Sequence, residues 1–99
     1  MKNFRDKVIA ITGAGSGIGR ALAQAFGPRG ARLALSDRDE ATLAETVSQL
    51  ALPAARVQAT SLDVSDRAAV LSYADQVVDH FGAVDVVINN AGLSIAPTP

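Results

Sequence analysis

Residues 8–19 have the sequence VIAITGAGSGIG, and this stretch decides the fold of the 99-residue chain. Its first four residues are apolar and predict a short buried strand, and the glycines that follow predict a tight loop. Residues 20–26, which favour a helix, come next. The first amides of a helix have no intrahelical partner, and the helix dipole adds about half a positive charge where they point. The stretch therefore predicts a site for a phosphate group, such as a nucleotide pyrophosphate.

The glycine spacing separates this loop from two common nucleotide-binding loops. The pattern G-x-G-x-x-G would need a third glycine at Ile18, and an ATP-binding P-loop would need a glycine at Ile18 or Arg20 followed by lysine. The pattern that fits is T-G-x-x-x-G-x-G, on Thr12, Gly13, Gly17 and Gly19. It is the pattern of the short-chain dehydrogenase/reductase family, which the chain resembles. On this motif alone, a glycine turn that serves only packing is the alternative.

Composition bounds the class of protein. The chain is 48% hydrophobic and 19% charged, with net charge −1, which indicates one globular unit without the basic patch that nucleic acid or an anionic membrane would require. It has no cysteine and one histidine, which excludes a disulfide framework and a cysteine or histidine metal site. The charged N-terminal residues precede only a very short apolar run. They predict no signal peptide or membrane span, and a cytoplasmic location.

The remaining chain alternates predicted strands and helices. Pro28 should end or kink the first helix near Phe26, Asp39 is a plausible N-cap for the second helix, and Ser65 one for the third. Further strands are predicted at 31–36, 56–60 and 84–89, the last nearly continuously apolar and typical of a strand covered on both faces. The apolar face of the second helix is formed by Leu43, Val47 and Leu50, and that of the third by Val70, Ala74, Val77, Val78 and Phe81. The order β-α-β-α-β-α-β predicts an α/β Rossmann-type parallel sheet with strand order 3-2-1-4.

Asp37 ends the second predicted strand, 18 residues after Gly19 (37 − 19 = 18). A ribose-binding acid is expected about 20 residues after the glycine loop, where its carboxylate accepts hydrogen bonds from both hydroxyls. The same charge would repel a 2′-phosphate, which favours NAD over NADP. Arg38 could stack on the adenine or neutralise a phosphate, which leaves a strict preference open. Members of the family that prefer NADP often have a basic residue where this chain has Ser16. The alternative role of Asp37 is a helix cap.

Two more segments match the resemblance. Asp63-Val64 follows the third strand, where the family places a carboxylate near the adenine amino group and an apolar side chain against the ring. Asn89-Asn90-Ala91-Gly92 follows the fourth strand and corresponds to the family's N-N-A-G signature near the nicotinamide ribose. Alone, an aspartate before a helix is more often a turn or cap residue. The resemblance implies a cofactor site formed by Gly13, Ser16, Gly17, Ile18, Gly19, Asp37, Arg38, Asp63, Val64, Asn90, Ala91 and Gly92.

The resemblance covers residues 1–99 as the N-terminal part of one NAD(P)-binding domain, and it implies an enzyme that moves a hydride between NAD and an alcohol or ketone. The family's catalytic serine, tyrosine and lysine, with an assisting asparagine, come after N-N-A-G and are not found here. Tyr73 has Val77 where the lysine would stand, so it is interpreted as a packing or surface residue, and His80 as a surface residue. We expect the cofactor-binding half of a longer homo-oligomeric enzyme, inactive by itself. A stand-alone nucleotide-binding module and a remnant that does not fold are the alternatives.

Overall fold

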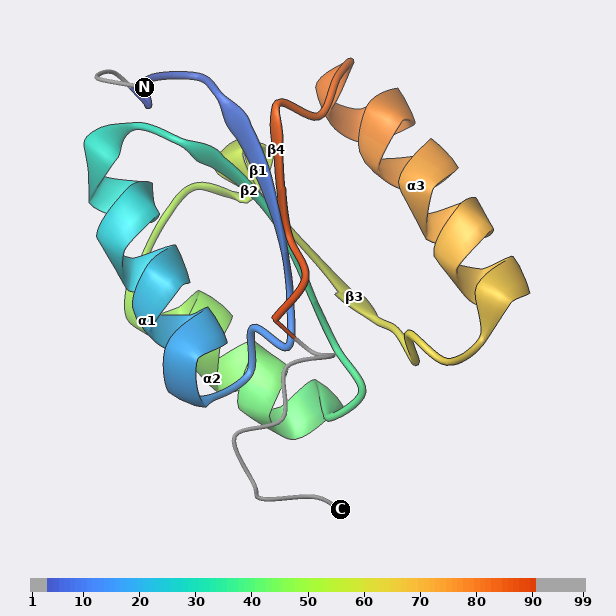
Figure 1. Cartoon of the computed structure of the whole chain (residues 1–99). Helices are drawn as coiled ribbons and strands as arrows, with labels where there is room; N and C mark the ends of the chain where they lie inside the picture. Colours follow the sequence, from blue (N-terminus) through green and yellow to red (C-terminus); the bar gives the residue numbers. More distant parts are fainter. Residues whose placement is uncertain (1–3, 91–99) are drawn as a thin grey trace.

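The computed structural model describes residues 4–90 and shows one sheet with helices on both faces (Figure 1). The strands are β1 (Val8–Thr12), β2 (Arg32–Asp37), β3 (Val57–Ser61) and β4 (Val86–Ile88). The helices are α1 (Gly17–Phe26), α2 (Glu40–Leu50) and α3 (Arg67–Phe81), and two short 3₁₀ turns occupy Gly27–Arg29 and Ala54–Arg56. The helix α1 ends at Phe26 as predicted, and Pro28 lies in the turn that follows it.

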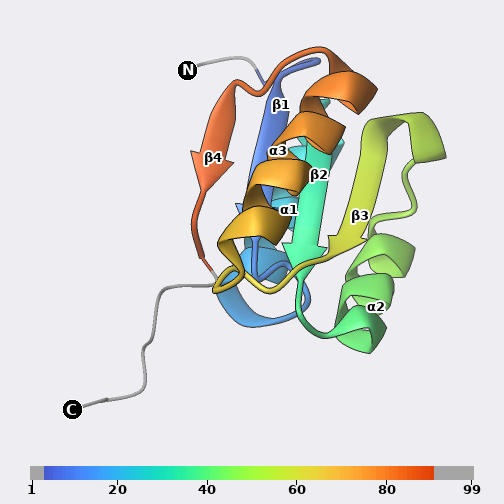
Figure 2. The same ribbon diagram turned by 90° about the vertical axis from the view of Figure 1, so that its right-hand side faces the viewer.

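The four strands are parallel and lie in the order β3-β2-β1-β4, which confirms the predicted topology. Figure 2 shows them side by side, with α3 in front of the sheet. After β3 the chain crosses past β2 and β1 to place β4 on the other side of β1. Strand order therefore reverses between β1 and β4, the position at which open α/β sheets bind ligands at the carboxyl ends of the strands.

One face of the sheet packs against α1 and α2. Alternate residues of β1 and β2 lie on this face and are fully buried, as expected for strand side chains that alternate between faces. The apolar face of α2 lies over them as predicted, with Leu43 buried and Val47 and Leu50 partly buried. The members from the two strands are Ile9, Ile11, Leu33 and Leu35. This cluster fixes α1 and α2 on the sheet, and with them the loop between β1 and α1.

The other face packs against α3 through a narrower row than predicted. Tyr73, Val77 and Phe81, spaced four residues apart, contact the small residues of β1 and β2. Val70 packs beside this row as predicted. Val78 and Ala74 lie on the predicted face, because both line the groove between α3 and β4, but Val78 is 47% exposed and Ala74 is exposed as well. Burial of Tyr73 confirms that it is a packing residue.

The strand β4 is shorter and less covered than predicted. The Asp85 carboxylate accepts a hydrogen bond from the Val8 amide at 2.8 Å, so a side chain takes a place that a strand carbonyl would otherwise fill, and β4 begins at Val86. Val86 and Ile88 pack against the α1 and α2 face, whereas Val87 on the opposite face is 60% exposed. Val87 lines an apolar groove of about 420 Å³ between β4 and α3. Coverage of both faces of β4 is therefore not found within residues 4–90.

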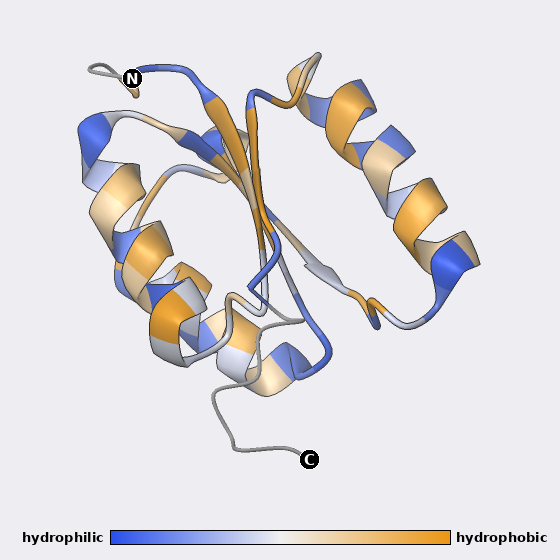
Figure 3. Cartoon of the chain, in the orientation of Figure 1, coloured by the Kyte–Doolittle hydropathy of each residue, from blue (hydrophilic) through white to orange (hydrophobic). Residues whose placement is uncertain are grey.

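Hydropathy follows these layers. Figure 3 shows β1 and β4 as mainly hydrophobic ribbons, with hydrophilic positions concentrated on the helices and at the ends of strands. Within the described residues, no helix has both the length and the apolar character needed to span a membrane.

The helix α3 is capped by Asp66, and the prediction of Ser65 as the cap was wrong. The Asp66 carboxylate accepts a hydrogen bond from the Ala69 amide at 3.1 Å. Ser65 instead donates its hydroxyl to the Asp63 carboxylate at 2.6 Å and its amide to the same oxygen at 2.9 Å. The tight turn made by Asp63 uses the Ser65 hydroxyl, and the next residue becomes the cap.

We expect the two residues to differ in their effect on stability. Asp66→Ala should lower the free energy of unfolding by about 1 kcal/mol, because an amide of the first turn of α3 loses its acceptor. Ser65→Ala should lower it by less than about 0.5 kcal/mol, since the lost bond is exposed. Urea denaturation of both variants measures the difference. A larger loss for Ser65→Ala would contradict the assignment of the cap.

Candidate functional site

The predicted site residues within residues 4–90 lie at the carboxyl edge of the sheet. The glycine loop follows β1, Asp37 ends β2, Asp63 follows β3, and Asn90 follows β4. Hydrogen bonds join three of these segments. The Gly15 amide donates to the Asp37 carboxylate at 2.8 Å, and the Asn90 side-chain amide donates to the Gly13 carbonyl at 3.1 Å. Residues far apart in the sequence thus form one continuous rim.

The first turn of α1 offers backbone amides at this rim. The helix begins at Gly17, so the amides of Gly17, Ile18 and Gly19 have no acceptor within the helix. Ser16 occupies the N-cap position, but its side chain makes no capping hydrogen bond, and Ser16 and Ile18 are exposed. An uncapped helix start with exposed residues and a positive dipole end can bind an anion.

At Gly19 the backbone of the loop itself excludes a side chain. A Cβ atom built there would lie 2.1 Å from the carbonyl oxygen of Gly13 and 2.8 Å from the Asn90 side-chain nitrogen. The obstacle at Gly13 is backbone, which cannot rotate away as a side chain could. Glycine at this position lets the loop fold back closely over the start of α1, and this explains the last glycine of the motif.

Asp37 contacts two backbone amides. One carboxylate oxygen accepts from Gly15 at 2.8 Å and the other from Asp39 at 2.9 Å. A carboxylate offers about four acceptor positions, so two remain for a ligand that donates hydroxyl hydrogens. The predicted alternative, a cap for α2, is wrong: the helix is capped by Asp39, which accepts from Ala41 and Thr42.

Arg38 and Asp63 face each other across the ends of β2 and β3. Their charged atoms are 4.0 Å apart, the Arg38 side chain is largely exposed and that of Asp63 is 44% exposed, so the pair contributes little to stability. The hydrogen bond from the Ser65 hydroxyl is the main reason that the pKa of Asp63 lies below its ordinary value, and Arg38 lowers it slightly further. Asp63 is therefore an ionised acceptor at neutral pH. Val64 next to it is 39% exposed and offers an apolar surface.

The last part of the predicted site is described only to Asn90. Asn90 is half-buried and holds the loop after β1, whereas Asn89 is exposed. The predicted site residues Ala91 and Gly92 lie outside the described residues. The prediction that this segment lies beside the glycine loop is confirmed as far as Asn90.

Tyr73 and His80, which are interpreted from the sequence as non-catalytic, both lie in environments unsuited to catalysis. Burial raises the pKa of the Tyr73 phenol, and the Ser36 hydroxyl offsets part of that rise. A tyrosine acting as a general base needs a lowered pKa, so Tyr73 is unsuited to that role. His80 is exposed and contacts the edge of the Phe81 ring. Over the described range, no group of three or more histidine, cysteine or acidic residues could hold a metal ion.

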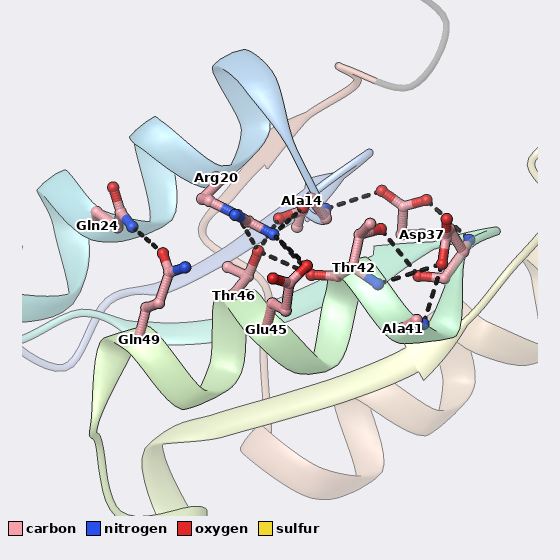
Figure 4. Close-up of polar contacts among 11 residues, drawn as sticks. Ala14, Arg20, Gln24, Asp37, Ala41, Thr42, Glu45, Thr46 and Gln49 are labelled. Carbon is pink, nitrogen blue, oxygen red and sulfur yellow. Dashed lines mark hydrogen bonds and ion pairs between the residues drawn. The ribbon is translucent and has the colours of Figure 1, made fainter.

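Sequence reasoning missed the contribution of α2 to the loop. Thr46, fully buried, donates its hydroxyl to the Ala14 carbonyl at 2.8 Å, and Arg20 contacts both the loop and α2 (Figure 4). Thr46 lies 32 residues after Ala14 in a stretch of ordinary helical composition. No spacing rule connects the two, so only the packing of α1 against α2 shows the contact.

Comparisons with known proteins agree with this geometry. The family model described as short chain dehydrogenase matches residues 7–98. The chain is 53% identical over 94 residues to the putative oxidoreductase SadH of Mycobacterium tuberculosis, covering 95% of this chain and 34% of that protein. It is 38% identical to the CLA biosynthesis dehydrogenase/reductase of Lactiplantibacillus plantarum, covering 96% and 33% respectively.

Solved structures show the same arrangement. A short chain dehydrogenase/reductase from Burkholderia phymatum in complex with NAD matches with a TM-score of 0.80 and 44% identity, over 88% of this chain and 31% of that one. A 3-ketoacyl-(acyl-carrier-protein) reductase from Brucella melitensis complexed with NADH matches with a TM-score of 0.78 and 32% identity, over 86% and 34%. The chain thus spans about a third of the length of these relatives.

Proposed function

The chain belongs to the short-chain dehydrogenase family, and on that premise we propose that it is the dinucleotide-binding part of an NAD-dependent oxidoreductase. Residues 1–99 are then the N-terminal part of one nucleotide-binding domain. The cofactor lies along the carboxyl edge of the sheet, with its pyrophosphate at the start of α1. The solved relatives with bound NAD or NADH support a nicotinamide cofactor.

The observation that carries this proposal is the bond between the Gly15 amide and the Asp37 carboxylate. It brings an acid with unused acceptor positions next to a loop that ends in the free amides of α1. A dinucleotide has the complementary groups, since its adenosine ribose presents two hydroxyls and its pyrophosphate follows within the same molecule. The close approach of Gly13 to Gly19 also fits, because it keeps side chains away from the amides.

Asp37 supports NAD over NADP as the ligand. Hydrogen bonds from a ribose to a carboxylate contribute about 1.5–3 kcal/mol each, or about 10–100-fold in affinity. A 2′-phosphate would bring a second anion to the same carboxylate. Arg38 could in principle compensate, but its guanidinium is near Asp63, and Ser16 adds no positive charge.

The other predicted contacts complete the cofactor site. Asp63 would accept from the adenine amino group, for which its ionised carboxylate is suited. Val64 would lie against the ring. Asn90 would position the loop, and Ala91 and Gly92 would pass close to the nicotinamide ribose. Each assignment is part of the proposal and can be tested by substitution.

The activity proposed for the whole enzyme is hydride transfer between NAD and a small alcohol or ketone. The bound nicotinamide supplies or accepts the hydride. The residues described here bind and orient the dinucleotide, and the proton transfer to or from the substrate oxygen belongs to the serine, tyrosine and lysine that the family has beyond N-N-A-G. A homo-oligomeric assembly is part of the same proposal. The present chain by itself should turn over no substrate.

Calorimetric titration of the purified chain with NAD, and separately with NADP, tests the proposal. Saturable binding of NAD that is tighter than binding of NADP is expected. Circular dichroism should first establish that the chain is folded. A folded chain that binds neither dinucleotide would overturn the proposal, and tighter binding of NADP would overturn the preference assigned to Asp37.

A further inference from the structure

Two side chains of the α1–α2 interface, Arg20 and Thr46, donate hydrogen bonds to carbonyl groups of the glycine loop (Figure 4). Arg20, in the second turn of α1, donates from Nε to the Thr46 hydroxyl oxygen at 2.8 Å. From Nη2 it donates to the carbonyl of Gly15 and, at 3.0 Å, to that of Thr42. One guanidinium therefore links the loop to α2 at three points.

Thr46 completes this link. Its hydroxyl has a single hydrogen, and the Ala14 carbonyl at 2.8 Å is a nearer acceptor than the Thr42 carbonyl at 3.3 Å. The hydroxyl thus accepts from Arg20 and donates to Ala14, and no part of the Thr46 side chain is exposed. An acceptor in this position that lost its donor would remain buried without a partner, which is costly.

All four backbone polar groups of Ala14 and Gly15 are consequently fixed within the protein. The two amides donate toward β2, Ala14 to the Ser36 carbonyl at 2.9 Å and Gly15 to Asp37. The two carbonyls accept from Thr46 and Arg20. A loop fixed on both sides has little freedom left, and the ordering that a ligand would otherwise have to impose is already present.

We propose that Arg20 and Thr46 are positioning residues for dinucleotide binding, which fix the loop so that the first-turn amides of α1 meet the pyrophosphate. The inference rests on the proposed function. The donor atoms of Arg20 that face the loop are engaged by Thr46, Gly15 and Thr42, so Arg20 acts on the ligand through the loop. Glu45, 3.7 Å from Nη2 and mostly exposed, offsets part of the positive charge.

The test compares ligands with and without a pyrophosphate. ADP-ribose and adenosine are titrated into the ¹⁵N-labelled chain, and the ratio of their affinities is followed by NMR. Thr46→Val keeps the shape of the side chain and removes the hydroxyl. Arg20→Lys keeps the charge but replaces the several nitrogen donors of the guanidinium with a single ammonium group. Both variants should lower the affinity for ADP-ribose by about tenfold and the affinity for adenosine by less than about twofold, as expected when one or two buried hydrogen bonds are lost.

Two variants serve as controls. Thr46→Ser restores the hydroxyl and should restore the wild-type ratio. Gln24→Ala removes the exposed bond of 2.7 Å to Gln49, which joins the same two helices away from the loop, and should leave the ratio unchanged.

Three results would count against the inference or its premise. Unchanged ADP-ribose affinity in Thr46→Val and Arg20→Lys would overturn it. Equal weakening of both ligands, or loss of folding in both variants, would assign the two residues to stability alone and would also overturn it. Failure of the folded wild-type chain to bind ADP-ribose would instead refute the proposed function.

Discussion

Gly19→Ala is expected to abolish measurable dinucleotide binding and to destabilise the chain. The added Cβ would lie 2.1 Å from the Gly13 carbonyl oxygen and 2.7 Å from its carbonyl carbon, so the loop backbone must move. Overpacking against a fixed neighbour should lower the free energy of unfolding by about 3 kcal/mol. Displacement of the loop also separates the phosphate from the amides of α1. Loss of one or two hydrogen bonds between these amides and the charged phosphate should lower the affinity for NAD by about 100-fold or more.

Gly82→Ala is a matched control for this substitution. Gly82 follows α3 with φ +85°, and an added Cβ would meet nothing within 4 Å. Alanine there should cost about 1–2 kcal/mol from its left-handed conformation alone. Calorimetry and urea denaturation of both variants then separate general destabilisation from loss of the loop. Wild-type NAD affinity in Gly19→Ala, or an equal loss of affinity in Gly82→Ala, would contradict the role of Gly19.

The sheet topology and the rim could be predicted because local patterns decide them. Glycine spacing fixes where β1 gives way to α1, and parallel strands joined by right-handed crossovers leave few possible orders. The carboxyl ends of such strands meet at one edge. The places of Asp37, Asp63 and Asn90 at this edge are therefore correctly predicted from their positions at or after the end of a strand.

Other features could not be predicted because two adjacent residues were equally suited to the same role, and the sequence pattern does not say which of them takes it. Ser65 and Asp66 are both good N-caps, and the prior bond of the Ser65 hydroxyl to Asp63 decides between them. Val77 and Val78 are equally apolar, and only the small residues of β1 and β2 decide that Tyr73, Val77 and Phe81 form the contact row. The role of Thr46 depends on how α2 crosses α1, which composition does not specify.

Asp37→Asn is expected to reduce NAD affinity by about 10–100-fold, the value of charge-assisted hydrogen bonds to ribose hydroxyls. The amide oxygen of asparagine can still accept from Gly15, so the loop should keep its position. The asparagine NH2 group cannot accept from the Asp39 amide, but that bond is exposed, so its loss should cost little stability and leave the fold intact. Removal of the charge also removes repulsion of a 2′-phosphate. NADP affinity should therefore fall less than NAD affinity, or rise, and the preference for NAD should narrow.

Asp39→Asn is the control that separates a direct contact from a general loss of negative charge. Asp39 lies two residues away, and asparagine caps a helix about as well as aspartate, so α2 should keep its start. At moderate salt this variant should change NAD affinity by less than about twofold, because exposed charges are screened. Equal losses in the two variants would show that the field of the carboxyl edge, rather than hydrogen bonds from Asp37, determines binding. Unchanged NAD affinity in Asp37→Asn would place the ribose away from the end of β2 altogether.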